Sequence, residues 1–492
     1  MQNARLRTIV CLVACLLIFA GRIHADELRV GVATADITPG ENFPMSGYYY
    51  ERSATGLKDL LQAKVLVFRQ ETPAAVILCD LIGIWTDLGY AVREGVQKET
   101  GIPAANVMIA GTHTHTGPDY NRELYAVMTG QPIPTGTKPR QPYIPRLIES
   151  LVAAVKRADS ETKPLILKSG TAKQEKTVSF NRRFLMQDGK VRTWMSLNSP
   201  GVVHAEGPID PEVGMVLFED PATQKPAAIL SSFALHLDTV GGSEWSADYP
   251  FFMERTLQGA LGNQVVSLFG NGCCGNINHV DPSKPERNSA EVIGTSLGKT
   301  ILTAVPKLGE VKSPQLQIRR TTVPLPLRKP TAEQLAKSKQ IIQLFQGGKT
   351  PEFYEHVEAN RWLIVEHLRH NGTPDLHKLM MWGMSIQLAG KGDFLTVDVQ
   401  VITLGRDVAI VALPGEVFVE LGLAIKNASP FKTTLVVELS NNLETLYVPT
   451  RYAYVGGGYE PTNSTLEPGS GELLAEAAIK LLSECAAGVT QK

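Results

Sequence analysis

The chain has 492 residues, of which 43% are hydrophobic and 20% are charged. That composition is typical of a folded globular protein, and a chain of this length can bury a large core. Its 48 lysines and arginines nearly balance its 49 acidic residues. The sequence therefore offers no excess positive charge with which to bind nucleic acid, and none is expected as a partner.

The first 25 residues differ from the rest of the chain. Arg5 and Arg7 precede an apolar run, and Ala25 closes the segment. This order predicts a secretory signal peptide over residues 1–25, so the protein is expected to be exported, to the periplasm, the cell surface or the medium. Leu12–Cys15 also matches a bacterial lipoprotein cleavage box, but the apolar run continues beyond it, which favours cleavage near Ala25.

Apolar runs bounded by glycine and proline predict short strands in the mature chain, and runs with helical spacing predict helices between them. Strands are predicted over residues 28–37, 63–68, 74–79, 106–110, 227–234 and 264–269, an extended segment over 165–185, and helices over 88–100, 142–156, 250–260 and 289–305. This alternation predicts an α/β fold with a mixed central sheet, flanking helices and a site at the strand ends.

The last third of the chain begins with a break at Pro324 and Pro326. Thr331–Gln334 then has the form of a capping box, and a helical insertion is expected near residues 331–372. Its two helices are predicted over 332–346 and 351–370, further strands over 399–404, 408–413 and 434–439, a closing helix over 471–485, and a long loop beside the site over 119–141.

The motif GTHTHTGP, residues 111–118, directly follows the strand predicted over 106–110. Because side chains alternate along an extended chain, His113 and His115 are expected to point the same way from the end of that strand. Two imidazoles placed together suit metal coordination or acid–base chemistry. The alternative is a polar loop in which both histidines are solvated.

Other candidate residues also follow predicted strands. His236 follows the strand over 227–234, Glu416 follows the strand over 408–413, and Tyr447 and Tyr459 lie in the loop after the last strand. Imidazoles with one carboxylate form the ligand set of a catalytic zinc site, which leaves a position open for water. Taken singly, His236 could be a core histidine and Glu416 could cap a following helix. Their repeated placement after strands favours one shared metal.

On these residues the chain resembles the neutral/alkaline, non-lysosomal ceramidase family, zinc-dependent amidases that cleave the N-acyl bond of ceramide. The resemblance runs from Val30–Ala33 and Asp36–Pro39 to the tyrosine-rich loop, and GTHTHTGP is its most specific part. It implies a lipid or small-molecule substrate and leaves room for peripheral contact with a membrane. Since the chain ends at Lys492, the family's C-terminal immunoglobulin-like domain is expected to be absent, and residues 26–492 are expected to form one catalytic domain.

The resemblance also implies a role for individual residues. Zn²⁺ would be held by His113, His236, Glu416 and Tyr447. His115 would lie just off the metal, with Arg182 and Tyr459 around the scissile group and Asn276 in a neighbouring catalytic loop. A cation and a phenol can stabilise the oxyanion that forms when an amide is attacked. The alternatives are a structural cation at Arg182 and a packed loop aromatic at Tyr459.

The loop over residues 271–278 departs from the family pattern. Aligning its outer asparagines puts Cys274 where the family has Asp, and Asn276 where it has Ser. Misplacing a reacting group by about 1 Å can cost roughly a hundredfold in rate. We therefore expect N-acyl amide hydrolysis with a weak or altered preference for ceramide, improved by Cys274→Asp with Asn276→Ser.

The sequence thus predicts an exported, zinc-dependent amidohydrolase that cleaves an N-acyl amide bond, with a ceramide-like lipid as its substrate. One alternative is a zinc hydrolase of another amide or ester, because fold and metal do not determine the substrate. Another is a binding protein that keeps the pocket without turnover. The joint presence of His113, His115, His236, Glu416 and Tyr447 argues against the binding protein.

Overall fold

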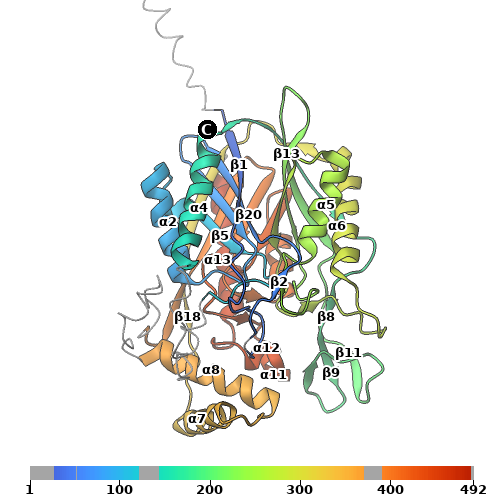
Figure 1. The fold of residues 1–492 in the computed structure, drawn as a ribbon, viewed down its shortest axis with the longest axis vertical. Coiled ribbons are helices and arrows are strands. Elements are labelled where there is room, and N and C mark those ends of the chain that lie inside the picture. The colour runs from blue at the N-terminus through green and yellow to red at the C-terminus, as the bar shows by residue number, and fades with distance from the viewer. Residues whose placement is uncertain (1–26, 51, 121–142, 371–390, 489–492) are drawn as a thin grey trace, which may run out of the picture.

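The computed structural model describes residues 27–50, 52–120, 143–370 and 391–488. The predicted signal peptide and most of the predicted loop over 119–141 lie outside the described residues. Within them, three larger sheets surround a shared core, and helices cover the outer sides (Figure 1). The prediction of a mixed α/β fold is confirmed. The prediction of one central sheet is wrong, because the strands divide among several sheets.

The first sheet has the strand order β5-β4-β3-β1-β6. Alternate side chains of β3 face opposite ways: Val65 and Val67 pack toward helices, and Leu66 packs toward the other sheets. Because both faces of β4 are buried, this strand is apolar throughout. The strands are β1 (Arg29–Asp36), β3 (Gln62–Arg69), β4 (Ala74–Cys79), β5 (Val107–Gly111) and β6 (Lys163–Pro164). The covering helices are α2 (Thr86–Thr100), which ends at left-handed Gly101, and α4 (Tyr143–Ser160).

The second sheet has the order β15-β13-β12-β7-β17. Met215 and Leu217 of its central strand pack toward helices, and Val216 packs toward the shared core. The strands are β7 (Ile166–Lys173), β12 (Glu212–Glu219), β13 (Pro226–Phe233), β15 (Val266–Asn271) and β17 (Gly309–Glu310), covered by α5 (Tyr249–Leu261) and α6 (Ala290–Ala304). Strand β12 is absent from the sequence prediction. The extended segment predicted over 165–185 is instead divided into β7, β8 (Phe180–Asn181) and the start of β9 (Arg183–Met186).

The third sheet has the order β18-β19-β20-β22. The predicted break at Pro324 and Pro326 is wrong. Both prolines lie in β18 (Leu316–Pro326), which pairs along its length with β19 (Phe394–Leu404). Since β18 is an edge strand, a proline without an N–H is tolerated there. The other strands are β20 (Val408–Ala412) and β22 (Thr433–Val437), and the covering helices are α10 (Val419–Ala428) and α13 (Ser470–Gly488).

Each sheet contains one parallel pair: β4 with β5, β13 with β15, and β20 with β22. The carboxyl ends of these pairs are joined by backbone hydrogen bonds. Asn441 N donates to Ile109 O at 2.8 Å, and Glu438 N donates to Asn271 O at 2.9 Å. The segments that leave the three pairs are therefore brought to one place in the molecule.

A further group of elements lies at the lower end of Figure 1. The predicted helical insertion is confirmed over its described residues as α7 and α8, and Thr331 and Gln334 form the predicted capping box. The elements at this end are α7 (Ala332–Gln346), α8 (Phe353–His370), β9, β10 (Val191–Thr193), β11 (Val202–Ala205), α11 (Ala453–Gly456) and α12 (Tyr459–Thr462). The remaining short elements are β2 (Gly56–Leu57), β14 (Glu244–Trp245), β16 (Ile277–Asn278), β21 (Glu416–Val417), β23 (Tyr447–Val448), η1 (Ala104–Asn106) and η2 (Val305–Lys307). Among the described helices, none is long and apolar enough to cross a membrane.

Candidate metal centre

Three acceptor atoms converge where the three sheets meet. His113 Nε2 lies 3.1 Å from His236 Nε2, and Glu416 Oε2 lies 3.4 Å from the first and 3.3 Å from the second. All three side chains are buried. They come from the segments that follow β5, β13 and β20, so each sheet contributes one side chain.

The hydrogen bonds of the two rings show which nitrogens carry protons. His113 Nδ1 lies 2.7 Å from Ile82 O, and His236 Nδ1 lies 3.0 Å from Cys274 O. A carbonyl only accepts, so each Nδ1 donates and each Nε2 of a neutral ring presents a lone pair. Burial, with Arg182 nearby, lowers the pKa of His236 to about 3, which keeps that ring neutral.

With both rings neutral, their Nε2 lone pairs face each other and Glu416 Oε2, and Arg182 Nη1 lies 3.4 Å from His236 Nε2. Within the described part of the chain, Glu416 Oε2 has no hydrogen-bond donor. Three mutually close acceptors repel unless a cation lies among them. A second set of possible metal-ligand atoms includes His115, which has a ring nitrogen within 4.8 Å of nitrogens of His113 and His236. These side chains could hold a metal ion.

The motif GTHTHTGP places its histidines differently from the prediction. β5 ends at Gly111, and His113 has a φ of 81°, so strand alternation does not orient the two rings. A left-handed backbone is rare for a residue other than glycine, and strained residues of this kind cluster at functional sites. It is held by His113 N, which donates to Leu81 O at 2.9 Å. The rings of His113 and His115 still lie together, with centroids 5.0 Å apart.

His115 lies beside the cluster in an aromatic and acidic setting. Its Nδ1 is 3.6 Å from Asp238 Oδ1, which also accepts a 2.6 Å hydrogen bond from Tyr48 Oη. Burial lowers the pKa of His115 to about 4, although Asp238 opposes that shift. The imidazole is therefore neutral at pH 7 and able to accept a proton.

Glu416 and Tyr447 are held side by side by backbone pairing. They are partners in the parallel bridge between β21 and β23. The alternative, that Glu416 caps the following helix, is wrong, because the N-cap of α10 is Phe418. Tyr447 Oη accepts a 3.0 Å hydrogen bond from Arg182. Burial raises the pKa of Tyr447 well above its usual value, and Glu416 adds to the shift.

Arg182 is a fully enclosed cation behind the cluster. Its guanidinium donates to Glu460 Oε1 at 2.9 Å and to Gly275 O at 2.8 Å. Glu460 also accepts from Arg183 at 2.7 Å, so two buried cations share one buried carboxylate. Arg182 thus orients Tyr447 and lies outside the set of side chains that line the pocket described below.

Asn276 and Cys274 fill structural positions in their loop. Asn276 Nδ2 donates to Glu420 at 2.9 Å, and its Oδ1 accepts from Val419 N at 2.9 Å, so this side chain fastens the start of α10. Cys274 Sγ lies 3.2 Å from His236 Nδ1, and its carbonyl accepts from that ring. The side chain of Asn276 does not line the pocket described below, so no contact there supports its predicted catalytic role.

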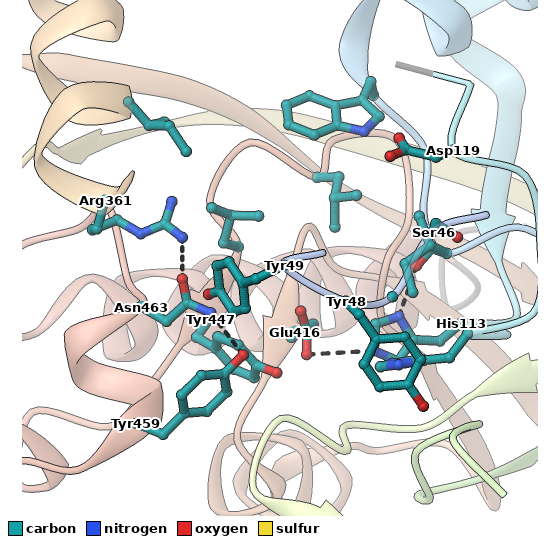
Figure 2. A pocket seen from close by; sticks show the side chains of 17 residues that line it. Ser46, Tyr48, Tyr49, His113, Asp119, Arg361, Glu416, Tyr447, Tyr459 and Asn463 are labelled. Carbon is teal, nitrogen blue, oxygen red and sulfur yellow. Dashed lines mark hydrogen bonds and ion pairs between the residues drawn. The ribbon is translucent and has the colours of Figure 1, made fainter. Parts of the chain in front are cut away.

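A pocket opens beside the three acceptor atoms (Figure 2). Figure 2 shows His113 at one side of it, Arg361 at the other, and Glu416 between them. Among the residues predicted for the site, His113, His115, Glu416, Tyr447 and Tyr459 line it. Its apolar wall comprises Ile82, Trp85, Ile364, Leu443 and Leu446.

Sequence reasoning missed part of this lining. Tyr48 and Tyr49 come from the run Tyr48–Tyr50, whose three consecutive aromatic residues are the one signal that could have drawn attention to it. Arg361 and Ile364 come from α8, the predicted insertion. Nothing in the local pattern of that helix marks these two side chains as pocket residues, because their position depends on how α8 is placed.

The fold and site together define a mixed α/β protein with a candidate metal centre where three sheets meet. Two solved structures share this fold. A neutral ceramidase from Pseudomonas aeruginosa is 20% identical with a TM-score of 0.67, over 93% of this chain and 75% of that one. A ceramidase complexed with C2 is 18% identical with a TM-score of 0.66, over 94% of this chain and 75% of that one.

The chain therefore has a neutral ceramidase-like fold, as the resemblance of its motifs implied. Identities of this size establish the fold alone. No protein-family model matches the sequence, and neither does any curated protein.

Proposed function

We propose that the protein is an exported zinc-dependent hydrolase that cleaves an N-acyl amide bond, with a ceramide-like lipid as its substrate. The observation that carries the proposal is the convergence of His113 Nε2, His236 Nε2 and Glu416 Oε2 within 3.1–3.4 Å of one another. The apolar wall of the adjoining pocket supports a substrate with a hydrocarbon chain, and the ceramidase-like fold supports the substrate class.

The spacing of the three acceptors suits zinc. Bonds of about 2.0–2.1 Å in a tetrahedral site put ligand atoms about 3.3–3.4 Å apart, and the observed separations are close to this. His113, His236 and Glu416 would hold the ion, and Tyr447, held in place by Arg182, would bind as a further ligand beside the position left for water. Zinc at such a site acts as a Lewis acid that activates water and polarises a carbonyl.

The remaining side chains have separate tasks in amide hydrolysis. Neutral His115 would take a proton from the attacking water and deliver it to the amine nitrogen as the C–N bond breaks. Asp238, 3.6 Å from His115 Nδ1, would stabilise the imidazolium formed in between. Tyr459, whose Oη accepts a 3.1 Å hydrogen bond from Asn463 Nδ2, keeps its own proton for the developing oxyanion.

The test is release of fatty acid from ceramide and from simpler N-acyl amines by purified protein, with chelator and after zinc is restored. We expect chelator-sensitive release. Tyr459→Phe should lower turnover by roughly 10²–10³-fold, because it removes one oxyanion donor. Tyr454→Phe is the matched control, since Tyr454 Oη donates to Leu466 O and its side chain does not line the pocket.

The other candidate functions predict different results. Release from esters or short amides without release from ceramide would favour a zinc hydrolase of another substrate. Binding of zinc and lipid with no release from any amide or ester would favour a binding protein. Release that persists in chelator would overturn the proposed mechanism.

A further inference from the structure

One end of the molecule holds α8, α11 and the small sheet of β9, β10 and β11 (Figure 1). Several apolar side chains on or beside these elements are exposed. Tyr452, the N-cap of α11, and Val455 within that helix are 72% and 82% exposed, the highest values among the large apolar side chains described. Trp194, directly after β10, is 48% exposed, and Phe353, which begins α8, is 42% exposed. Monomeric proteins seldom leave apolar groups together without a use for them. We call these four side chains the apolar rim.

The rim is joined to the pocket by a continuous series of aromatic rings. Pocket-lining Tyr459 has its ring centroid 4.7 Å from Trp194 and 5.9 Å from Phe353. Pocket-lining Tyr49 lies 6.1 Å from Phe353, and Trp194 and Phe353 lie 6.1 Å from each other. The pocket wall beside Glu416 and Tyr447 thus continues outward into the exposed rings.

The backbone holds Trp194 in place at a cost. Trp194 has a φ of 62°, a left-handed conformation that is rare for a bulky residue. Trp194 N donates to Arg182 O at 2.9 Å, and the Arg182 guanidinium lies 5.7 Å from the indole ring. A strained residue that presents a half-exposed indole points to a functional use of that ring.

The α11 part of the rim is fixed against the same sheet. Gly456 approaches β10 so closely that a methyl group there would lie 2.5 Å from Cγ2 of Val191. Arg183 of β9 donates to Gly457 O at 3.0 Å, directly after α11. Tyr452, Val455 and Trp194 therefore lie on elements that pack against one another.

We propose that the apolar rim docks on the surface of a phospholipid bilayer, with the pocket wall facing the lipid. Tryptophan and tyrosine combine an apolar body with a polar edge and are enriched at the level of lipid headgroups. A pocket with an apolar wall takes ligands that dissolve poorly in water, and the ring series places its wall next to the surface that would meet the lipid. A second copy of the chain on the rim would instead cover the side chains that border the pocket. That a lipid is the substrate rests on the proposed function, whereas docking itself requires no turnover.

The test is flotation of the full chain with phosphatidylcholine vesicles, together with quenching of tryptophan fluorescence by brominated phosphatidylcholine. We expect the protein to float with the vesicles. Tyr452→Ser with Val455→Ser should weaken partitioning at least tenfold, because two apolar side chains lose a lipid contact. The exposed residue Tyr90 on α2 gives the matched control, Tyr90→Ser, which should bind as the wild type does.

Trp194 provides a direct readout of contact. Trp194→Phe keeps an aromatic ring for docking but should remove most of the quenching. Chelator-treated protein should bind vesicles as well as the untreated protein does. The double variant Tyr452→Ser with Val455→Ser, called the α11 double variant, should hydrolyse a short-chain, water-soluble N-acyl amine at the wild-type rate. Failure of docking and failure of the proposed hydrolysis are thereby measured separately.

Three outcomes would overturn docking: no flotation of the wild type, equal loss of binding in the Tyr90→Ser control, or quenching unchanged by Trp194→Phe. A dimer in sedimentation that the α11 double variant dissociates would assign the rim to self-association instead.

Discussion

Replacing His113 and His115 in turn separates a metal ligand from a neighbour of the metal. His113 Nε2 lies 3.1 Å from His236 Nε2 and 3.4 Å from Glu416 Oε2, whereas the cluster that includes His115 spans up to 4.8 Å. Tetrahedral ligands lie about 3.3–3.4 Å apart, so His113 fits the first coordination shell better than His115 does. We expect His113→Ala to lose both zinc and turnover, and His115→Ala to lose turnover while it keeps zinc.

The size of each effect follows from the contacts. Losing a partner outside the first shell typically lowers metal affinity by about 10–100-fold, so losing His113 itself should exceed about 100-fold. Neither ring nitrogen of His115 is hydrogen-bonded to a described residue, so His115 is not such a partner, and His115→Ala should change zinc affinity by less than about tenfold. Its turnover should fall by roughly 10²–10⁴-fold, the usual contribution of a general base.

The assay is a zinc titration of each metal-free variant against a chromophoric chelator, with zinc content measured by mass spectrometry. Thermal melting of both variants controls for misfolding. Equal loss of zinc in the two variants would refute the reasoning, because it would make His115 a metal ligand. Wild-type turnover by His115→Ala would refute its role as a base.

Three further changes are expected to have measurable effects. Gly294→Ala should lower the free energy of unfolding by about 1–3 kcal/mol in denaturant titrations, since its new methyl group would lie 2.2 Å from Tyr249 O between α6 and α5. Burial raises the pKa of Glu444 to about 7, so the folded chain keeps a proton that the unfolded chain releases above about pH 4.3, and stability should fall as pH rises toward about 7. Glu444→Gln removes this contribution, so the melting temperature of the variant should fall less than that of the wild type between about pH 5 and pH 8. Cys274→Asp with Asn276→Ser, made together with Glu438→Gln because buried Glu438 already contacts position 274, should raise turnover of ceramide relative to simple N-acyl amines. An aspartate at 274 would accept a hydrogen bond from His236 Nδ1, which now lies 3.2 Å from Cys274 Sγ.

The first change has a control variant, and each of the other two has an outcome that would contradict it. Gly259→Ala on α5 meets no atom within 4 Å and should not destabilise the fold. A wild-type melting temperature that does not change over that pH range would contradict the buried proton on Glu444. Strong ceramide turnover by the wild type would remove the reason for changing Cys274.

Local signals predicted the helices well. Thr331 and Gln334 lie three residues apart, and Gly101 directly follows its helix, so both ends are determined by neighbours in the sequence. Strand pairing depends on distant partners and was predicted less well. Pro324 looks like a break until β19, about 70 residues further on, leaves β18 at the edge of its sheet.

The candidate site shows the same division. The sequence identifies the chemical types that converge, because His113, His236 and Glu416 each follow an apolar strand. Their mutual geometry depends on the left-handed backbone of His113 and on the pairing of Glu416 with Tyr447, and neither has a local signature. The lining from α8 depends on how that helix lies against the core, which the sequence of the helix alone does not determine.

The origin of the three acceptor atoms in three separate sheets also bears on how the chain folds. His113 and His236 are 123 residues apart in the sequence, so an ion between them would close a very long loop of chain. A partly folded chain with one sheet out of place would lack a donor and bind the ion weakly, so binding energy would stabilise only the complete structure. The ion would thus couple the three sheets into a single cooperative unit. The ion-free chain is expected to open first where the three sheets meet.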